Sequence, residues 1–232
     1  MAEPESTELA VSQAVLRRRA ARRFDPDRPL PDDLLKRILS LATHAPSSYN
    51  LQPWRFVVVR TERNRKRLRA CAFNQPNVSE APVVVIVLGY LRAWETDLDA
   101  MLEQRVALGA ATPESAAETR RRATDKLSRV ADLGSWALRS AMIAVGMMLL
   151  AAESLGVASA PMEGFDPSRI KDVFGVPDDH VVCALVALGY ALETDPFPGR
   201  FGLEHVCYEE HFGGPWHLGE PDRTEAGGAC GS

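Results

Sequence analysis

The stretch APSSYNLQPWRFVVVR occupies residues 45–60 and joins a polar loop with rigid prolines to a compact apolar run. The run FVVV at residues 56–59 is rich in β-branched side chains and apolar on both faces, which is typical of a strand at the centre of a sheet. The sequence therefore predicts a central strand from Trp54 to Arg60, preceded by a loop from Ala45 to Pro53.

Helices and strands are expected on both sides of this strand. An amphipathic pattern from Leu9 ends in a basic run at Arg17–Arg19, and Pro31 and Asp32 suit the first turn of a second helix that runs to Ala42. The elements expected after the strand are a helix at about 62–72, a strand at 83–88, a helix at 135–155 ended by Gly156, and a strand at 181–188.

Residues 93–124 have a weaker pattern and more charge, and we interpret them as a mobile helical lid. No internal repeat, low-complexity block or linker divides the chain. We therefore expect one α+β domain over residues 9–212, with a flexible leader at 1–8 and a flexible tail, rich in glycine and polar residues, at 213–232.

Composition excludes several classes of function. The net charge is −4, with 27 Lys and Arg dispersed among 31 Asp and Glu, so no nucleic-acid partner is expected. The four cysteines form no CxxC pair and have no histidines at zinc-finger spacing, which indicates neither a disulfide framework nor a metal site. The N-terminus lacks a secretory signal, and the apolar stretch at 141–152 is shorter than the roughly twenty residues of a membrane span. These features predict a cytoplasmic protein without a membrane partner.

The first polar cluster is Arg18-Arg19-Ala20-Ala21-Arg22, at the end of the first predicted helix. Its guanidinium groups can converge on a phosphate through paired hydrogen bonds. A solvated basic face explains the same residues, and the cluster taken alone favours that interpretation.

The second cluster is the loop that contains Pro46, Ser47, Ser48 and Asn50. Two hydroxyls, two side-chain amides and rigid prolines between a helix and a buried strand suit recognition of a planar heterocycle with alternating donors and acceptors. By composition alone, an ordinary turn is the better-supported interpretation.

The third cluster is Pro161-Met162-Glu163-Gly164, after the long apolar helix. A backbone that is held by proline and freed by glycine can approach a flat ring and donate its N–H groups to a ring nitrogen. Glu163 is an acid in an apolar stretch, and a solvated loop carboxylate is an equally good explanation for it.

The three clusters, in this order and separation, resemble the nitroreductase family over roughly residues 14–206. The motifs that carry the resemblance are RRAARRF, APSSYNLQPWRFVVV, LAAESLGVASAPMEGF and ALVALGYALE. The resemblance implies an α+β fold with a central mixed, mainly antiparallel sheet flanked by helices. It also implies an intertwined homodimer with two FMN sites at its interface, to which the apolar helix at 141–152 contributes.

At the phosphate end of the implied FMN site, Arg18, Arg19 and Arg22 would hold the phosphate and the ribityl chain, and Arg200 matches a C-terminal phosphate-binding arginine. The residues that would come from the partner subunit are Pro46, Ser47, Ser48 and Asn50.

At the ring end, Asn74 falls where the family reads the pyrimidine edge of the flavin. The segment that would lie against the isoalloxazine ring, with the Gly164 backbone near its reactive N5, is Pro161, Met162, Glu163 and Gly164.

The sequence departs from the family pattern at three positions. Ala20 stands where many members have a serine that bonds the phosphate, and Asn77 takes a position often occupied by a lysine near N1 of the flavin. Pro198 replaces a second C-terminal cation. The polar contacts to FMN are therefore expected to be fewer than in other members.

The activity that the resemblance implies is transfer of hydride from NAD(P)H through flavin N5 to a small electron-poor acceptor, such as a nitroaromatic or a quinone, with ping-pong kinetics. No side chain need act as nucleophile or base. The sequence contains no GxGxxG after a strand, no P-loop and no HExxH, so a Rossmann site, a nucleotide-phosphate loop and a zinc-protease site are unsupported.

Three alternatives stay open. One is a specialised member of the same family, such as a reductive dehalogenase, an enal or semialdehyde reductase or a flavin-fragmenting enzyme, with its specificity in the lid. Another is a flavin-binding protein without turnover. A structural protein without a cofactor would require all three clusters to be incidental.

Overall fold

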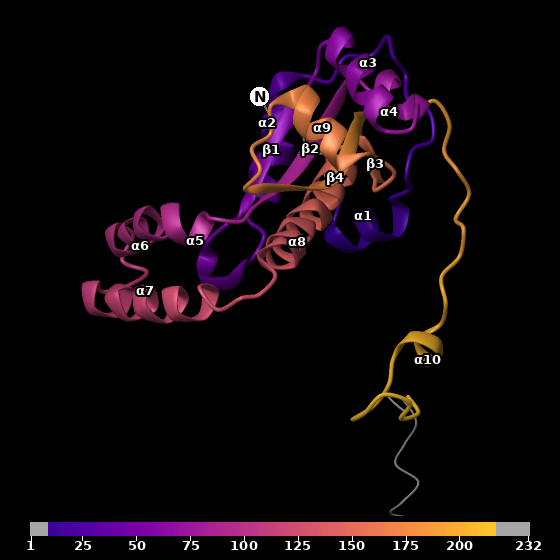
Figure 1. Cartoon of the computed structure of the whole chain (residues 1–232). Coiled ribbons are helices and arrows are strands. Elements are labelled where there is room, and N and C mark those ends of the chain that lie inside the picture. Colours follow the sequence, from indigo (N-terminus) through magenta and orange to yellow (C-terminus); the bar gives the residue numbers. More distant parts are fainter. Residues whose placement is uncertain (1–8, 217–232) are drawn as a thin grey trace, which may run out of the picture. The chain divides into compact units, whose positions relative to one another are not determined.

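The computed structural model describes residues 9–216 (Figure 1). The expected leader and residues 217–232 of the expected tail lie outside this range. The chain divides between Asp195 and Pro196 into two units. The first unit contains the sheet and nine α-helices, and the described part of the second contains the short helix α10, Leu203–Val206.

A four-stranded sheet forms the centre of the first unit, in the order β1-β2-β4-β3. Its strands are β1 (Trp54–Val59), β2 (Val83–Tyr90), β3 (Ala158–Met162) and β4 (His180–Gly189). All neighbouring strands are antiparallel, and a single parallel bridge joins Ala20 to Ser159 among the described residues. The expected α+β class with a mainly antiparallel sheet is confirmed.

The predicted central position of the Trp54–Arg60 strand is wrong. Within the described chain, β1 pairs with β2 alone and forms an edge of the sheet, and Val58 is 37% exposed. The apolar side chains of β1 pack into the cores on both faces of the sheet, Trp54 on one face and Val59 on the other. Packing on both faces does not depend on whether a further strand pairs with the edge of β1.

Helices cover both faces of the sheet, and the side chains of the central strand β2 alternate between them. Val83, Val85 and Val87 pack with residues of α2 (Asp32–Ala42) and α8 (Leu133–Ser154). On the other face, Val84, Ile86 and Leu88 of β2 pack with residues of three helices. These helices are α3 (Glu62–Cys71), α4 (Pro76–Glu80) and α9 (Pro167–Phe174). The uninterrupted burial of β2 follows from this coverage.

Side-chain caps fix where the main helices begin. The Thr61 hydroxyl accepts a hydrogen bond at the start of α3, and the Asp166 carboxylate accepts one at the start of α9. At the start of α8, the Asp132 carboxylate accepts hydrogen bonds from the hydroxyl and the backbone N–H of Ser135, and both lower the pKa of Asp132. These caps position the helices that carry or flank the site.

The predicted lid contains three helices, α5 (Ala93–Thr96), α6 (Leu98–Ala107) and α7 (Pro113–Leu127). Figure 1 shows them extending away from the sheet. Buried side chains of α6 and α7 cluster with Leu51, which follows the short 3-10 helix η1 at Ser48–Asn50. The lid helices thus rest on the loop of the second cluster, and the mobility of the lid stays a prediction.

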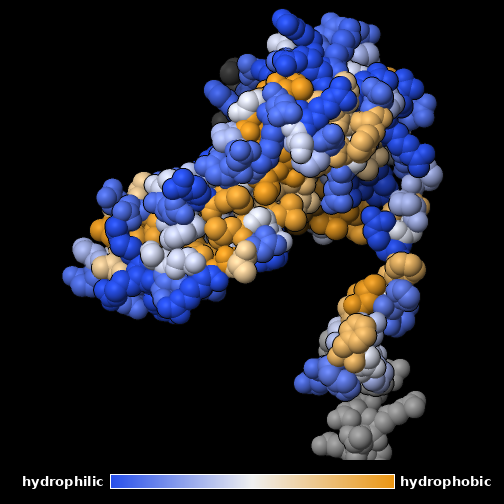
Figure 2. All heavy atoms as spheres, in the orientation of Figure 1, coloured by the Kyte–Doolittle hydropathy of each residue, from blue (hydrophilic) through white to orange (hydrophobic). Residues whose placement is uncertain are grey.

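The long helix α8 agrees with the helix predicted at 135–155 and includes the apolar stretch at 141–152. By length and composition its 22 residues could cross a membrane, but half of the relevant window is buried inside the fold, as in the core helix of a soluble protein. Three of its apolar side chains, Leu138, Ile143 and Met147, are 38–46% exposed. Figure 2 shows apolar surface where Figure 1 places α8.

Candidate functional site

The first cluster lies beside strand β3. It follows α1 (Val11–Arg17), and the backbone N–H of Ala21 donates to the carbonyl of Ser159 at 3.0 Å, next to the Ala20–Ser159 bridge. The Nη1 atom of Arg18 is buried and has no hydrogen-bond partner among the described residues. A cationic donor therefore lies unsatisfied where the chain crosses from α1 to the sheet.

The other two arginines of the cluster have partners within the chain. Arg19 Nη1 donates to the carbonyls of Leu16, Arg17 and Arg18 at 2.8–3.1 Å and so caps the end of α1. Arg22 pairs with Asp195 at 3.3 Å and is largely exposed. Arg19 thus points back at its own helix, and the exposed pair of Arg22 is open to exchange for a stronger anion.

The segment Phe73–Asn77 contains the tight turn after α3 and the first two residues of α4. Phe73 and Asn74 have left-handed backbones, with φ values of 51° and 60°. Side chains other than glycine and asparagine rarely adopt this conformation, and such strain gathers at functional sites. The Oδ1 atom of Asn77 is buried and unpartnered within the described chain.

The third cluster meets this turn. Pro161 and Met162 end strand β3, and the exposed residues Glu163 and Gly164 follow it. The side-chain amide of Gln75 donates to the Gly164 carbonyl at 2.7 Å. Two segments that are 89 residues apart in sequence are therefore joined directly.

Strand β3 brings three separate segments together along one line. The first cluster joins it at Ser159, and the Phe73–Asn77 turn joins the chain just beyond its end, at Gly164. Five residues of extended chain span at most roughly 17 Å. The arrangement suits an elongated ligand with an anionic end near Arg18 and a polar, flat end near Asn74.

The second cluster has a strained backbone of its own. Tyr49, Asn50 and Gln52 have φ values of 56°, 59° and 49°. The Ser47 hydroxyl accepts a hydrogen bond from the Gln52 N–H at 2.9 Å and holds the loop closed. A cavity of about 450 Å³ adjoins this loop, and its walls include Pro46, Ser47, Ser48, Trp136, Arg139 and Ile143.

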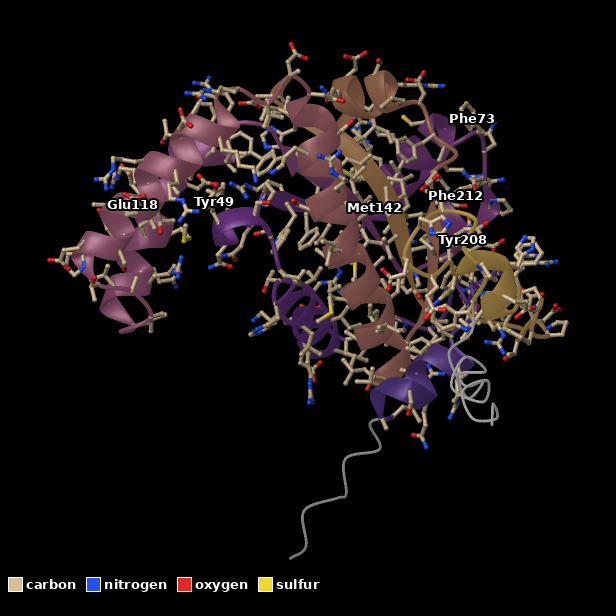
Figure 3. The ribbon with its side chains drawn as sticks, turned by 90° about the horizontal axis from the view of Figure 1, so that it is seen from below. Tyr49, Phe73, Glu118, Met142, Tyr208 and Phe212 are labelled. Atoms are coloured by element: carbon tan, nitrogen blue, oxygen red, sulfur yellow. The ribbon has the colours of Figure 1, made fainter. Side chains whose placement is uncertain are left out.

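This loop lies apart from the other clusters of the same chain. Figure 3 shows Tyr49 and Phe73 on opposite sides of α8, with Met142 of that helix between them. Arg200 lies in the second unit, where its guanidinium group is 5.4 Å from the centre of the Phe197 ring. The roles of Ser47, Ser48, Asn50 and Arg200 stay predictions.

Two residues at the site were not singled out from the sequence, although Ser159 lies within the motif LAAESLGVASAPMEGF. Ser159 is 1% exposed, and its hydroxyl has no partner in the part of the chain that the structure describes. A serine alone in the apolar run VASAPM was the available signal. Gln75 has no local signal, because its partner Gly164 is distant in sequence.

The cysteines offer no reactive thiol near these segments. Cys71 and Cys183 are buried and free, and burial raises the pKa of both thiols, that of Cys183 to about 12. Both are protonated at neutral pH. Cys207, the remaining cysteine within the described range, lies in the second unit.

Comparison with known proteins identifies the family. The model of the nitroreductase family matches residues 15–190. The chain is 39% identical over 198 residues to an NADH dehydrogenase of Thermus thermophilus, covering 85% of this chain and 95% of that one. It is 30% identical over 180 residues to an oxygen-insensitive NAD(P)H nitroreductase of Salmonella typhimurium, covering 73% of this chain and 83% of that one. The chain belongs to the nitroreductase family.

A solved structure gives the same result for the fold. A nitroreductase-like protein of Exiguobacterium sibiricum, crystallised in complex with FMN, superposes with a TM-score of 0.81 at 25% identity, covering 87% of this chain and 97% of that one.

The residues on either side of β3 fit an FMN molecule. Buried atoms without a partner in the described chain include a guanidinium donor at Arg18, a hydroxyl at Ser159 on β3 and an amide oxygen at Asn77 on α4. Buried polar atoms rarely lack partners in a folded protein, and a bound group can supply them. A phosphate suits the arginine, and the hydroxyl-rich chain and heterocycle of FMN suit the other two.

Proposed function

We propose that this chain is an FMN-dependent oxidoreductase that transfers hydride from NAD(P)H to a small, electron-poor organic acceptor such as a nitroaromatic or a quinone. The observation that carries the proposal is the meeting of Arg18–Arg22, Phe73–Asn77 and Pro161–Gly164 along strand β3. Each segment offers unsatisfied or exposed polar groups, and family membership supplies the ligand that matches them.

Arg18 and Arg22 would hold the phosphate, with Arg22 exchanging Asp195 for the stronger anion. Asn74 and Asn77 would meet the pyrimidine edge, and the Gly164 backbone would face N5. A Cβ at Gly164 would lie 3.3 Å from the Gln75 amide, so glycine lets the backbone come close. The chemistry that FMN supplies when bound is acceptance of hydride at N5 and its delivery to the acceptor.

The same face of the ring would receive NAD(P)H and the acceptor in turn, which gives ping-pong kinetics. The residues along β3 bind and orient, and no side chain of theirs need exchange a proton with the substrate. The exposed Glu163 would lie beside the ring and contribute negative charge there.

A second copy of the chain would complete each site. Figure 3 shows Tyr49, which belongs to the loop with Pro46, Ser47, Ser48 and Asn50, across α8 from Phe73, so in its own chain this loop lies away from the Phe73 turn. The exposed apolar side chains of α8 offer a surface for the partner (Figure 2). Such an interface would carry this loop to the flavin of the other copy, in a cytoplasmic homodimer.

The second candidate function is a specialised activity within the family, with its specificity in the lid. A cleft of about 440 Å³ between α6 and α7 is lined largely by apolar side chains, including Leu102, Val106, Pro113 and Ala116. A panel of nitroaromatics, quinones, enals, semialdehydes and halogenated aromatics, assayed with the reduced protein, separates a broad reductase from a specialised one.

The decisive experiment uses the purified full chain. We expect a yellow protein, or one that becomes yellow with added FMN, whose flavin absorbance is bleached by NADH or NADPH and restored by an acceptor. A chain that cannot take up FMN contradicts the proposal. Stable FMN binding without NAD(P)H oxidation would instead indicate a flavin-binding protein without turnover.

A further inference from the structure

Two polar side chains hold the turn after α3 from both sides. They are Arg69, from the last turn of α3, and Gln75, from the turn itself, and we call this pair the α3 clamp. Neither residue is among the predicted FMN contacts. Both act on backbone atoms next to residues that are.

Arg69 fixes the backbone on both sides of Asn74. Its Nε donates to the Asn74 carbonyl at 3.0 Å, and its own carbonyl accepts from the Asn74 N–H at 3.0 Å. Its Nη1 donates to the Ser79 hydroxyl at 3.1 Å, which anchors the guanidinium group on α4. A left-handed backbone costs roughly 1–2 kcal/mol for a residue such as Phe73, so contacts like these stabilise the turn at Phe73 and Asn74.

Gln75 links the turn to the third cluster. Its side-chain amide has two N–H donors, and it donates to the Ala72 carbonyl at 3.1 Å and to the Gly164 carbonyl at 2.7 Å. Gly164 is exposed and has no side chain to restrain it. Its orientation therefore depends on hydrogen bonds such as this one.

We propose that Arg69 and Gln75 are positioning residues that fix the backbones of Asn74 and Gly164 for their contacts with the pyrimidine edge and N5 of FMN. This inference rests on the proposed function. Groups that are held in place before the reaction stabilise developing charge more effectively than groups that must reorient. The clamp should thus influence the reduction potential and the rate of hydride transfer, and leave the affinity for NAD(P)H nearly unchanged.

A purely structural staple makes a different prediction. If the clamp only joins α3 to the segment after β3, its loss lowers the stability of the chain without changing the flavin. The reduction potential, the flavin absorption spectrum and the division of an effect between kcat and KM distinguish the two roles.

The test compares Gln75→Met with Gln104→Met in the full chain loaded with FMN. Methionine has nearly the length of glutamine and donates no hydrogen bond, and Gln104 is an exposed residue of α6. For Gln75→Met we expect the rate of flavin reduction by NADH to fall about tenfold with KM within about twofold, the loss of one hydrogen bond in the transition state. The potential and the spectrum should shift, and Gln104→Met should match the wild type in all four measurements.

Arg69→Met, compared with Arg63→Met on the exposed side of the same helix, should raise the Kd for FMN about tenfold, as expected for a lost charged hydrogen bond. If Gln75→Met does not fold, Gln75→Asn keeps the amide and withdraws it from Gly164, and the same shifts are expected. If Gln75→Met has the same reduction potential, flavin spectrum and reduction rate as Gln104→Met, the positioning role of the clamp is overturned, even if the melting temperature of Gln75→Met falls. A wild-type chain that takes up no FMN overturns the proposed function and the clamp together.

Discussion

Arg67 and Arg169 cap the ends of each other's helices. Arg67 Nη2, on α3, donates to the Val173 carbonyl in the last turn of α9 at 3.1 Å, and Arg169 Nη1, on α9, donates to the Ala70 carbonyl in the last turn of α3 at 2.9 Å. Basic groups are favourable at the carbonyl end of a helix. The reciprocal caps join the helix that leads into the Phe73 turn to the helix that follows Gly164.

Removing either cap should lower the stability of the chain. For Arg67→Met and Arg169→Met we expect a loss of about 0.5–1 kcal/mol each in the free energy of unfolding, measured by urea denaturation. Both caps hold the same helix pair, so the double variant should lose a different amount from the sum. Additive losses, or an equal loss in the exposed control Arg63→Met, would contradict mutual capping.

The buried nitrogen of Arg18 should strengthen FMN binding. Replacing Arg18 by Met should weaken FMN binding by roughly tenfold to a hundredfold, since a hydrogen bond to a charged group contributes about 1.5–3 kcal/mol. Fluorescence titration of the apoprotein with FMN measures the change. The neighbouring Arg17 is exposed on α1, and Arg17→Met should bind FMN as the wild type does. Equal effects at both positions would show that only net charge matters.

A charge on the exposed face of α8 should separate the two copies. Ile143 is 46% exposed, and Ile143→Glu would bury a carboxylate at the proposed interface. We expect a monomer by light scattering, with FMN lost along with the partner's loop. Leu108, which follows α6, is 75% exposed, and Leu108→Glu should leave a dimer with FMN. A monomeric wild type that binds FMN tightly would rule out the shared site.

Cys183 should make the folded chain sensitive to alkali. Burial raises the pKa of this thiol from its ordinary value of 9.0 to about 12, so the folded state keeps a proton that the unfolded chain releases. The stabilisation is complete below about pH 9 and is lost as the pH rises toward 12. Urea midpoints for Cys183→Ala should fall less steeply over this range than those of Cys207→Ala. Parallel curves would contradict the raised pKa.

The elements with strong local patterns were predictable. Helix α2 begins at Asp32, as Pro31 and the acidic first turn indicated, and the apolar run of β2 is the buried strand that was expected. Strand β3 was not predicted. It reads ASAPM, with small residues and a proline, and it becomes a strand by pairing with β4, where Ser159 lies opposite Leu188. That pairing is a long-range property, which a local pattern does not contain.

The candidate site also has parts that local sequence patterns predict and parts that depend on long-range contacts. Its motifs predicted which segments bind FMN, and those roles stay predictions, while the fold brings Arg18–Arg22, Asn74 and Gly164 to one strand. Gln75 and Gly164 are 89 residues apart in sequence, and no local sequence pattern predicts their hydrogen bond. The edge position of β1 could not be predicted either. Apolar side chains on both faces of a strand indicate packing above and below the sheet, and they do not indicate whether a second strand pairs beside it.

Tyr49 keeps a left-handed backbone while its side chain packs against the apolar cluster that joins α6, α7 and Trp136. Glycine there would keep the same backbone angle without the steric cost of roughly 1–2 kcal/mol, but it would remove the ring from that cluster. One aromatic side chain therefore ties the form of the serine loop to the seating of the lid helices, so an exchange that eases the loop would loosen the lid.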